Sequence, residues 1–216
     1  MRLSSRTARN APRQRPELPA LIGDAAASCG RIAAACLCIC ALGQGLTPGS
    51  RVGGFDLQKL DGTPAPFSSL RGSTTVVAFI SANCPVSNGF NDRMTALFND
   101  YSARGVKFVF INSNANESAA EVAQHRQSAG FPFEVYRDPG NRAADLFGAM
   151  ATPETYVIDS GGILRYHGYI EDSINEARVK HRALRAALDA VLAGKPVPAA
   201  GTKAFGCSIK RARRTT

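Results

Sequence analysis

Cys84 is the residue of this chain best placed to act as a nucleophile. It follows an apolar run, residues 75–81, and precedes Pro85 and a stretch with helical periodicity. A strand that leads through Cys-Pro into a helix places the thiol at a helix N-terminus, where partial positive charge stabilises a thiolate. The thiolate is the reactive form of cysteine. The alternative is a free cysteine that packs as a small buried hydrophobe, but burial alone does not require this context.

A second cysteine, Cys207, follows Gly206 in the C-terminal part of the chain, whereas four other cysteines precede residue 44. Ser87 stands three residues after Cys84, so the local motif is C-x-x-S and no disulfide can form within it. A reactive thiol needs a second sulfur to be recycled within the molecule. The Pro- and Gly-containing segment after Gly194 is long enough to bring Cys207 to Cys84. The sequence leaves open whether Cys207 resolves Cys84 or is a structural or unpaired cysteine.

Other ionisable residues give weaker signals. The three histidines, His125, His167 and His181, lack the spacing of metal ligands, and we expect no metal site. Arg137 or Arg165 would lower the pKa of Cys84 if either lay beside it, while ordinary surface positions are the alternative for both.

Composition and charge describe a soluble globular protein with charged ends. The chain has 216 residues, of which 44% are hydrophobic and 20% charged. The net charge of +9 comes mainly from arginines in residues 1–43 and from basic residues 210–214, so the body is nearly neutral and nucleic-acid binding is not expected. Arg31, followed by an apolar stretch to Gly43, predicts an export signal or N-terminal anchor over residues 1–43, and thus a periplasmic or extracellular protein.

Hydrophobic periodicity predicts an α/β domain. We expect strands over residues 55–60, 76–81, 106–111 and 133–136, and a hairpin of strands 155–159 and 163–169. We expect one helix from Cys84 to Gly105, a second opened by a capping box at 118–121, a third capped by Asn141, and a last one ending at Gly194. Alternation of this kind predicts a parallel central sheet covered by helices on both faces, with an antiparallel edge from the hairpin.

The Thr152-Pro153 pair before a buried strand, combined with a helix-capping cysteine, resembles the thioredoxin-like superfamily. Residues 53–57, 61–62, 67–72, 155–159 and 165–168 are similar to its redoxin branch, the alkyl hydroperoxide reductase and thiol-specific antioxidant proteins. The similarity covers about residues 51–195. It implies a thioredoxin-like fold with a central mixed sheet, a domain over residues 44–195 and a C-terminal tail over 196–216 that carries Cys207.

The resemblance implies a cis Pro153 packed beside Cys84, with Pro85, Ser87, Thr152 and Pro153 binding the substrate. Cys84 stands five residues after Phe79, the position of the first cysteine of a thioredoxin-type C-x-x-C.

The function expected from this resemblance is an exported thiol–disulfide oxidoreductase with Cys84 and Cys207 as catalytic residues. The alternatives are a thiol-dependent peroxidase and a non-catalytic binding module. We expect no cofactor. The expected partners are a protein or small-molecule thiol or disulfide, or a peroxide, and an external reductant. We expect no nucleic acid, and membrane contact only through an uncleaved N-terminal segment.

Overall fold

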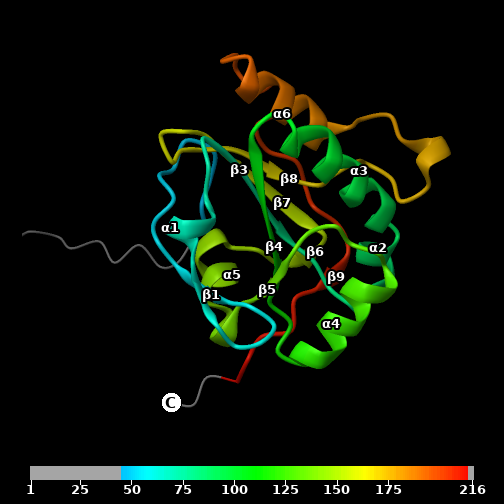
Figure 1. Cartoon of the computed structure of the whole chain (residues 1–216). Coiled ribbons are helices and arrows are strands. Elements are labelled where there is room, and N and C mark those ends of the chain that lie inside the picture. The colour runs from blue at the N-terminus through cyan, green and yellow to red at the C-terminus, as the bar shows by residue number, and fades with distance from the viewer. Residues whose placement is uncertain (1–44, 214–216) are drawn as a thin grey trace, which may run out of the picture. The chain divides into compact units, whose positions relative to one another are not determined.

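The computed structural model describes residues 45–213, so the segment predicted as an export signal lies outside the described residues. A seven-stranded sheet with the order β2-β1-β5-β4-β3-β7-β8 forms its centre, and a two-stranded sheet pairs β6 with β9 (Figure 1). The strands are β1 (Asp56–Gln58), β2 (Pro64–Pro66), β3 (Thr74–Phe79), β4 (Val106–Asn112), β5 (Val135–Arg137), β6 (Ala151–Thr152), β7 (Glu154–Ile158), β8 (Leu164–Gly168) and β9 (Cys207–Ser208).

The central sheet is mixed, as the resemblance implied. Strands β3, β4 and β5 run parallel, whereas β7 pairs antiparallel with β3 and β8 pairs antiparallel with β7. All six residues of β3 are buried, which explains its uninterrupted apolar character, because both of its faces are covered.

Helices cover both faces of this sheet, which confirms the predicted architecture (Figure 1). Helices α3 (Asn91–Ser102), α4 (Ala119–Ser128) and α6 (Ala183–Leu192) pack against one face around Phe110 and Tyr166. Helices α1 (Phe67–Leu70) and α5 (Arg142–Phe147) pack against the other around Phe79 and Tyr156. Alternate residues of β3 enter the two cores, with Val76 in one and Val77 in the other, as the period of two in a strand requires.

Two local predictions were wrong. The single helix expected after Cys84 is two helices, α2 (Pro85–Asn88) and α3, because Gly89 ends α2 and Phe90 leaves the helical conformation with φ −107° and ψ 2°. The break directs the Phe90 ring into the core. The side chain of Asn141 does not cap α5. The carboxylate of Asp138 accepts the free N–H groups of that helix instead, from residues 143 and 144 at 2.9 Å each.

Other sequence signals are confirmed. Ser118 and Glu121 form the predicted capping box of α4. Strands β7 and β8 form the predicted hairpin around Gly161 and Gly162. Two 3₁₀ turns, Pro139–Asn141 and Glu176–Arg178, complete the helical elements. Among residues 45–213, no helix combines the length and the apolar character needed to cross a bilayer.

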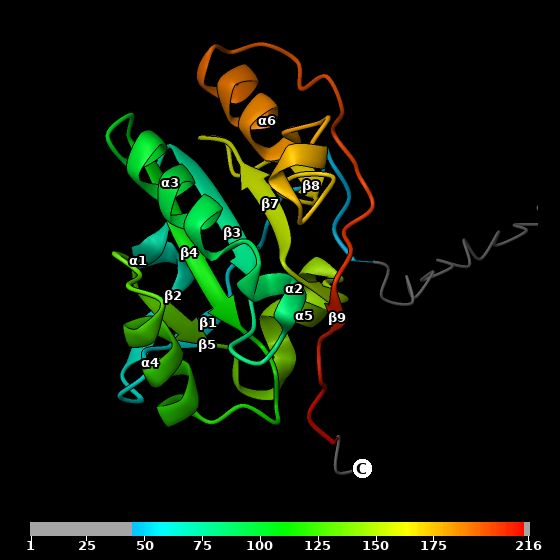
Figure 2. The same ribbon diagram turned by 90° about the vertical axis from the view of Figure 1, so that its right-hand side faces the viewer.

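The C-terminal segment, residues 200–212, packs along the domain instead of leaving it. It first runs beside β8, where the backbone of His167 bonds to Ala200 and Thr202 at 3.0 and 2.9 Å. It then reaches β6, pairs with it as β9, and contacts α2 (Figures 1 and 2). The segment predicted as a tail therefore forms one side of the neighbourhood of Cys84.

Candidate active site

Cys84 lies in the loop after β3, at the N-cap of α2. Its side chain is buried, with 2% relative exposure, and its Sγ accepts a hydrogen bond from the backbone N–H of Ser87 at 3.3 Å. Pro85 is the first residue of α2, where a missing N–H costs nothing, and it is exposed. Because α2 has a single turn, individual N–H donors stabilise a thiolate here, and not the dipole of a long helix.

The Thr152–Pro153 peptide bond is cis, as predicted. The Cys84 thiol donates a hydrogen bond to the Thr152 carbonyl at 3.3 Å, so the proline loop lies directly against the cysteine. The side chains of both loop residues are buried. The two motifs that carried the resemblance to the thioredoxin-like fold therefore meet in one place, although 68 positions separate them in the chain.

Cys207 completes this group. Strand β9 pairs with β6 in a register that places Cys207 opposite Thr152. The thiol and the backbone N–H of Cys207 lie close enough to interact with the sulfur of Cys84, and the N–H of Val86 interacts with the sulfur of Cys207. Both cysteines are free thiols, and Cys207 is half-buried. The structure thus brings together the two cysteines that the sequence singled out.

Opposite pKa shifts distinguish the two thiols. Burial raises the pKa of Cys84, but hydrogen bonds from the Cys207 thiol, the Ser87 N–H, the Thr152 hydroxyl and the Cys207 N–H outweigh it, and the net pKa is lowered. The pKa of Cys207 is raised, first because its proton is held in the bond to Cys84 and second by burial. Of the two thiols, Cys84 is therefore the one whose ionisation its surroundings favour.

The arginines considered from the sequence are engaged elsewhere. Arg137 donates to the backbone carbonyl of Glu117, and Arg165 pairs with Asp159 at 2.5 Å. Hydrogen bonds, and not a neighbouring arginine, lower the pKa of Cys84.

The carboxylate of Glu117 holds the loop that leads to Cys84. It is 3% exposed and accepts hydrogen bonds from the Ser81 hydroxyl at 2.5 Å and the Ala82 N–H at 2.9 Å. It also accepts a long hydrogen bond from the Asn83 N–H at 3.4 Å and one from the Asn112 amide at 2.5 Å. Sequence reasoning missed this residue, because a lone glutamate before a helix cap carries no distinguishing pattern.

A second buried carboxylate, Glu154, holds the proline loop. One of its oxygens accepts the N–H groups of Met150 and Ala151 at 2.7 and 2.9 Å. The other contacts His167 Nε2 at 2.5 Å and the Tyr156 hydroxyl at 3.1 Å. Burial raises the pKa of Glu154, but the hydrogen bonds from His167 and the two N–H groups lower it below its ordinary value. Its position directly after Thr-Pro is the sequence signal that would have identified it.

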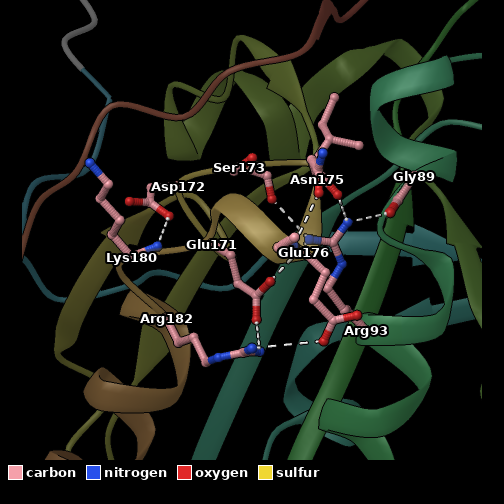
Figure 3. A network of polar contacts seen from close by, with 11 residues as sticks. Gly89, Arg93, Glu171, Asp172, Ser173, Asn175, Glu176, Lys180 and Arg182 are labelled. Atoms are coloured by element: carbon pink, nitrogen blue, oxygen red, sulfur yellow. Dashed lines mark hydrogen bonds and ion pairs between the residues drawn. The ribbon is translucent and has the colours of Figure 1, made fainter.

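A polar network fixes the segment next to the end of α2 (Figure 3). Glu171 is buried and pairs with Arg93 at 3.0 Å and with Arg182 at 2.6 Å. Arg93 also donates to the carbonyl of Gly89 at 2.6 Å and to that of Ile174 at 2.5 Å. The network therefore attaches the loop after β8 to both α3 and the C-terminal end of α2.

The predicted substrate-binding residues differ in accessibility. Pro85 is exposed, whereas Ser87, Thr152 and Pro153 are buried. The Ser87 hydroxyl accepts the Ser81 N–H at 3.2 Å, so its side chain supports the loop, and only its N–H contacts Cys84. Within residues 45–213, no group of three or more His, Cys, Asp or Glu side chains is arranged to hold a metal ion.

Residues 48–167, more than half of the chain, match the AhpC/TSA family. The chain belongs to this family. The matched region contains Cys84 and Pro153 but ends before α6 and Cys207. The predicted redoxin branch is therefore confirmed, and its confirmation does not depend on the C-terminal segment.

Similar proteins and solved structures agree with membership of the AhpC/TSA family. The chloroplastic peroxiredoxin Q of Sedum lineare is 28% identical over 130 residues, which cover 56% of this chain and 67% of that protein. The chain also matches the chloroplastic peroxiredoxin Q of Oryza sativa subsp. japonica, and it spans only 58% of the length of that protein. An uncharacterized conserved protein from Geobacillus kaustophilus is 30% identical, with a TM-score of 0.72, over 78% of this chain and 94% of that one.

The peroxidoxin BcpB of Mycobacterium tuberculosis, 20% identical with a TM-score of 0.55 over 69% of this chain and 97% of that one, shares the fold. These findings confirm the predicted thioredoxin-like fold and a thiol-based oxidoreductase of the redoxin family.

Proposed function

We propose that this protein is a two-cysteine thiol oxidoreductase in which Cys84 is the nucleophile and Cys207 resolves it. The observation that carries the proposal is the pairing of β9 with β6, which sets Cys207 opposite Thr152, the residue whose carbonyl accepts the Cys84 thiol. The pKa values of the two thiols shift in opposite directions. Ser87 occupies the position of the missing local cysteine, and Cys207 supplies the second sulfur from β9.

Thiol–disulfide exchange is the reaction expected from the position of Cys84. Its thiolate attacks one sulfur of a substrate disulfide, the S–S bond breaks, and the leaving thiolate takes up a proton. Cys207 then attacks Cys84 in the mixed disulfide and releases the second substrate thiol. The substrate gains two electrons, the protein keeps a Cys84–Cys207 disulfide, and an external thiol reductant restores both thiols.

Reduction of a hydroperoxide is the second candidate, and the similarity to peroxiredoxin Q supports it. The Cys84 thiolate attacks the peroxide, the O–O bond breaks, and the alcohol or water leaves after protonation, so that Cys84 becomes a sulfenic acid. Cys207 attacks this sulfur, water leaves, and the same intramolecular disulfide forms. Both reactions therefore share one oxidised state and one reductive step.

Peptide mapping without reduction tests the shared step. After one equivalent of oxidant, we expect a single linked peptide that joins Cys84 to Cys207. Cys207→Ser should instead accumulate a mixed disulfide or a sulfenic acid at Cys84, and Cys84→Ser should not react. If only intermolecular disulfides form and Cys207→Ser turns over as fast as the wild type, Cys207 is not the resolving residue. An unreactive Cys84 would favour the non-catalytic binding module.

The place of action proposed for this enzyme is outside the cytoplasm, supported by the Arg-then-apolar pattern that ends at Gly43. N-terminal sequencing of protein recovered from an exported fraction tests this directly. We expect a mature chain that begins close to residue 44, or an uncleaved segment that keeps the protein at the membrane. A chain that begins at Met1 in the cytoplasmic fraction would contradict export.

A further inference from the structure

We propose that the C-terminal segment determines the substrate of Cys84. The segment covers the strand edge beside the proline loop, so a protein disulfide cannot bind there. A hydroperoxide is small enough to reach the sulfur and is therefore the oxidant. This inference rests on the proposed two-cysteine function and selects between its two reactions. It concerns residues 200–212, which lie entirely outside the part of the chain that matches the family.

The strand edge beside the proline loop is already occupied. An extended peptide binds a protein by adding a strand to an exposed edge, where main-chain hydrogen bonds provide the affinity. Strand β6 offers such an edge next to Cys84, but β9 of the same chain pairs with both of its residues. The pairing sets Cys207 opposite Thr152, so this chain's own segment takes the place beside β6 that an added peptide strand would need.

The segment is attached on both sides of this pairing. Before it, the ring of Phe205 packs against Phe90 and Tyr169, with centroids 6.2 and 6.4 Å apart. After it, Ile209 is 7% exposed in the core that contains α5. Lys210 continues the attachment through its backbone, with two hydrogen bonds of 2.8 Å to Asn114 and Ala115.

Gly206 allows the close approach of this segment to the proline loop. Its φ is +150°, and a Cβ added there would lie 2.0 Å from the carbonyl oxygen of Thr152 and 2.8 Å from its carbonyl carbon. Both atoms belong to the backbone and cannot turn away as a side chain would. Any larger residue at position 206 therefore has to lift the segment from β6.

The closed arrangement excludes substrates by size. A protein disulfide brings main chain on both sides of its sulfur, which requires the edge that β9 occupies, and Cys84 beneath it is only 2% exposed. A hydroperoxide needs contact with the sulfur alone. Thr152 and Pro153, expected from the resemblance to contact substrate, are buried because the chain provides its own occupant for their surface.

The test compares reduced full-length wild type with Gly206→Ala and measures the rate of Cys84 oxidation by hydrogen peroxide and by insulin. We expect the wild type to react with peroxide and to react far more slowly with insulin. Gly206→Ala should raise the insulin rate by about fivefold to a hundredfold, the range by which strain at a forced backbone conformation shifts the closed–open equilibrium. Its peroxide rate should change much less.

Gly201→Ala is the matched control, because a Cβ at that position of the same segment meets no atom within 4 Å. It should leave both rates unchanged. If circular dichroism shows that Gly206→Ala is unfolded, Phe205→Ala is used in its place. This variant removes the aromatic attachment of the segment, and we expect it to react faster with insulin for the same reason. If insulin oxidises Cys84 of the wild type as fast as Cys84 of Gly206→Ala or Phe205→Ala, the proposed size exclusion is wrong. The two-cysteine function would still stand in that case. No reaction with either oxidant in any variant would instead reject the two-cysteine function.

Discussion

Replacing Glu117 by glutamine tests whether the buried carboxylate holds the loop in front of the nucleophile. The carboxylate accepts four donors, from Ser81, Ala82, Asn83 and Asn112. A glutamine keeps the shape of the side chain but replaces one acceptor oxygen by an amide group that is itself a donor. Whichever way that amide turns, two of the four hydrogen bonds to this side chain are lost; of the donors, the Asn83 N–H has a second acceptor in the Ser81 hydroxyl at 3.2 Å.

The expected loss follows from the burial of these groups. An unsatisfied buried donor costs about 1–3 kcal/mol. Because Ala82 is only half-buried and Asn83 is exposed, we expect Glu117→Gln to lower the free energy of unfolding by about 2–4 kcal/mol, a large part of the ~5–15 kcal/mol typical of a domain. The loop also sets Ser87 through the Ser81 N–H, so alkylation of Cys84 at neutral pH should slow.

Urea unfolding followed by far-UV circular dichroism measures the change. Glu134→Gln is the matched control, because that carboxylate is 52% exposed and pairs with Arg126 on the surface. The control should stay within about 0.5 kcal/mol of the wild type. A Glu117→Gln protein that unfolds within the same margin and keeps the alkylation rate would refute the assigned role of this carboxylate.

Three further predictions concern the site and the core. Alkylation of Cys84, followed by mass spectrometry of its peptide, should give an apparent pKa below the ordinary thiol value of about 8.5, and Cys207→Ala should raise it because a donor is lost. An unchanged value would show that Cys207 does not stabilise the thiolate. Glu154 has a lowered pKa, so its contribution to stability is complete above the ordinary carboxyl pKa of about 4.3 and is lost as pH falls through the lowered value. The difference in unfolding free energy between wild type and Glu154→Gln should accordingly shrink in acid, and a difference that grows would contradict this sign. Phe147→Ala should cost about 3–5 kcal/mol, because the ring is fully buried among other rings, whereas Met150→Ala, 68% exposed, should be nearly neutral in the same urea experiment.

The sequence predicted what local patterns encode. The buried strand, Cys84-Pro85 and Thr152-Pro153 each leave a signature in a few consecutive residues, and the resemblance joined them into one fold. The break at Gly89 was missed because the apolar spacing continues across it, and burial of the Phe90 ring decides the backbone there. The Asp138 carboxylate caps α5 in place of the Asn141 side chain because a 3₁₀ turn, Pro139–Asn141, precedes the helix, which no helix-start pattern anticipates.

The position of the C-terminal segment against β6 could not be predicted from its residues. Its prolines and glycines indicate an extended chain, but the pairing of Cys207 with Thr152 depends on tertiary contacts at Phe205 and Ile209. The roles of Glu117 and Glu154 are invisible for the same reason, since their donors come from other parts of the chain. The sequence therefore identified the candidate cysteines, and only the three-dimensional structure showed which residues hold them in place.

The order of the chain has a consequence for its synthesis. Strand β9 is the last element, and it follows every strand of the central sheet. The polypeptide is made from its N-terminus, so the strands of the sheet and Cys84 emerge before Cys207. During that interval Cys84 lacks the second sulfur that Cys207 supplies, and β9 does not yet cover the edge of β6. A chain interrupted before β9 would therefore present Cys84 and the β6 edge to other chains, and we expect it to form mixed disulfides more readily than the chain that carries β9.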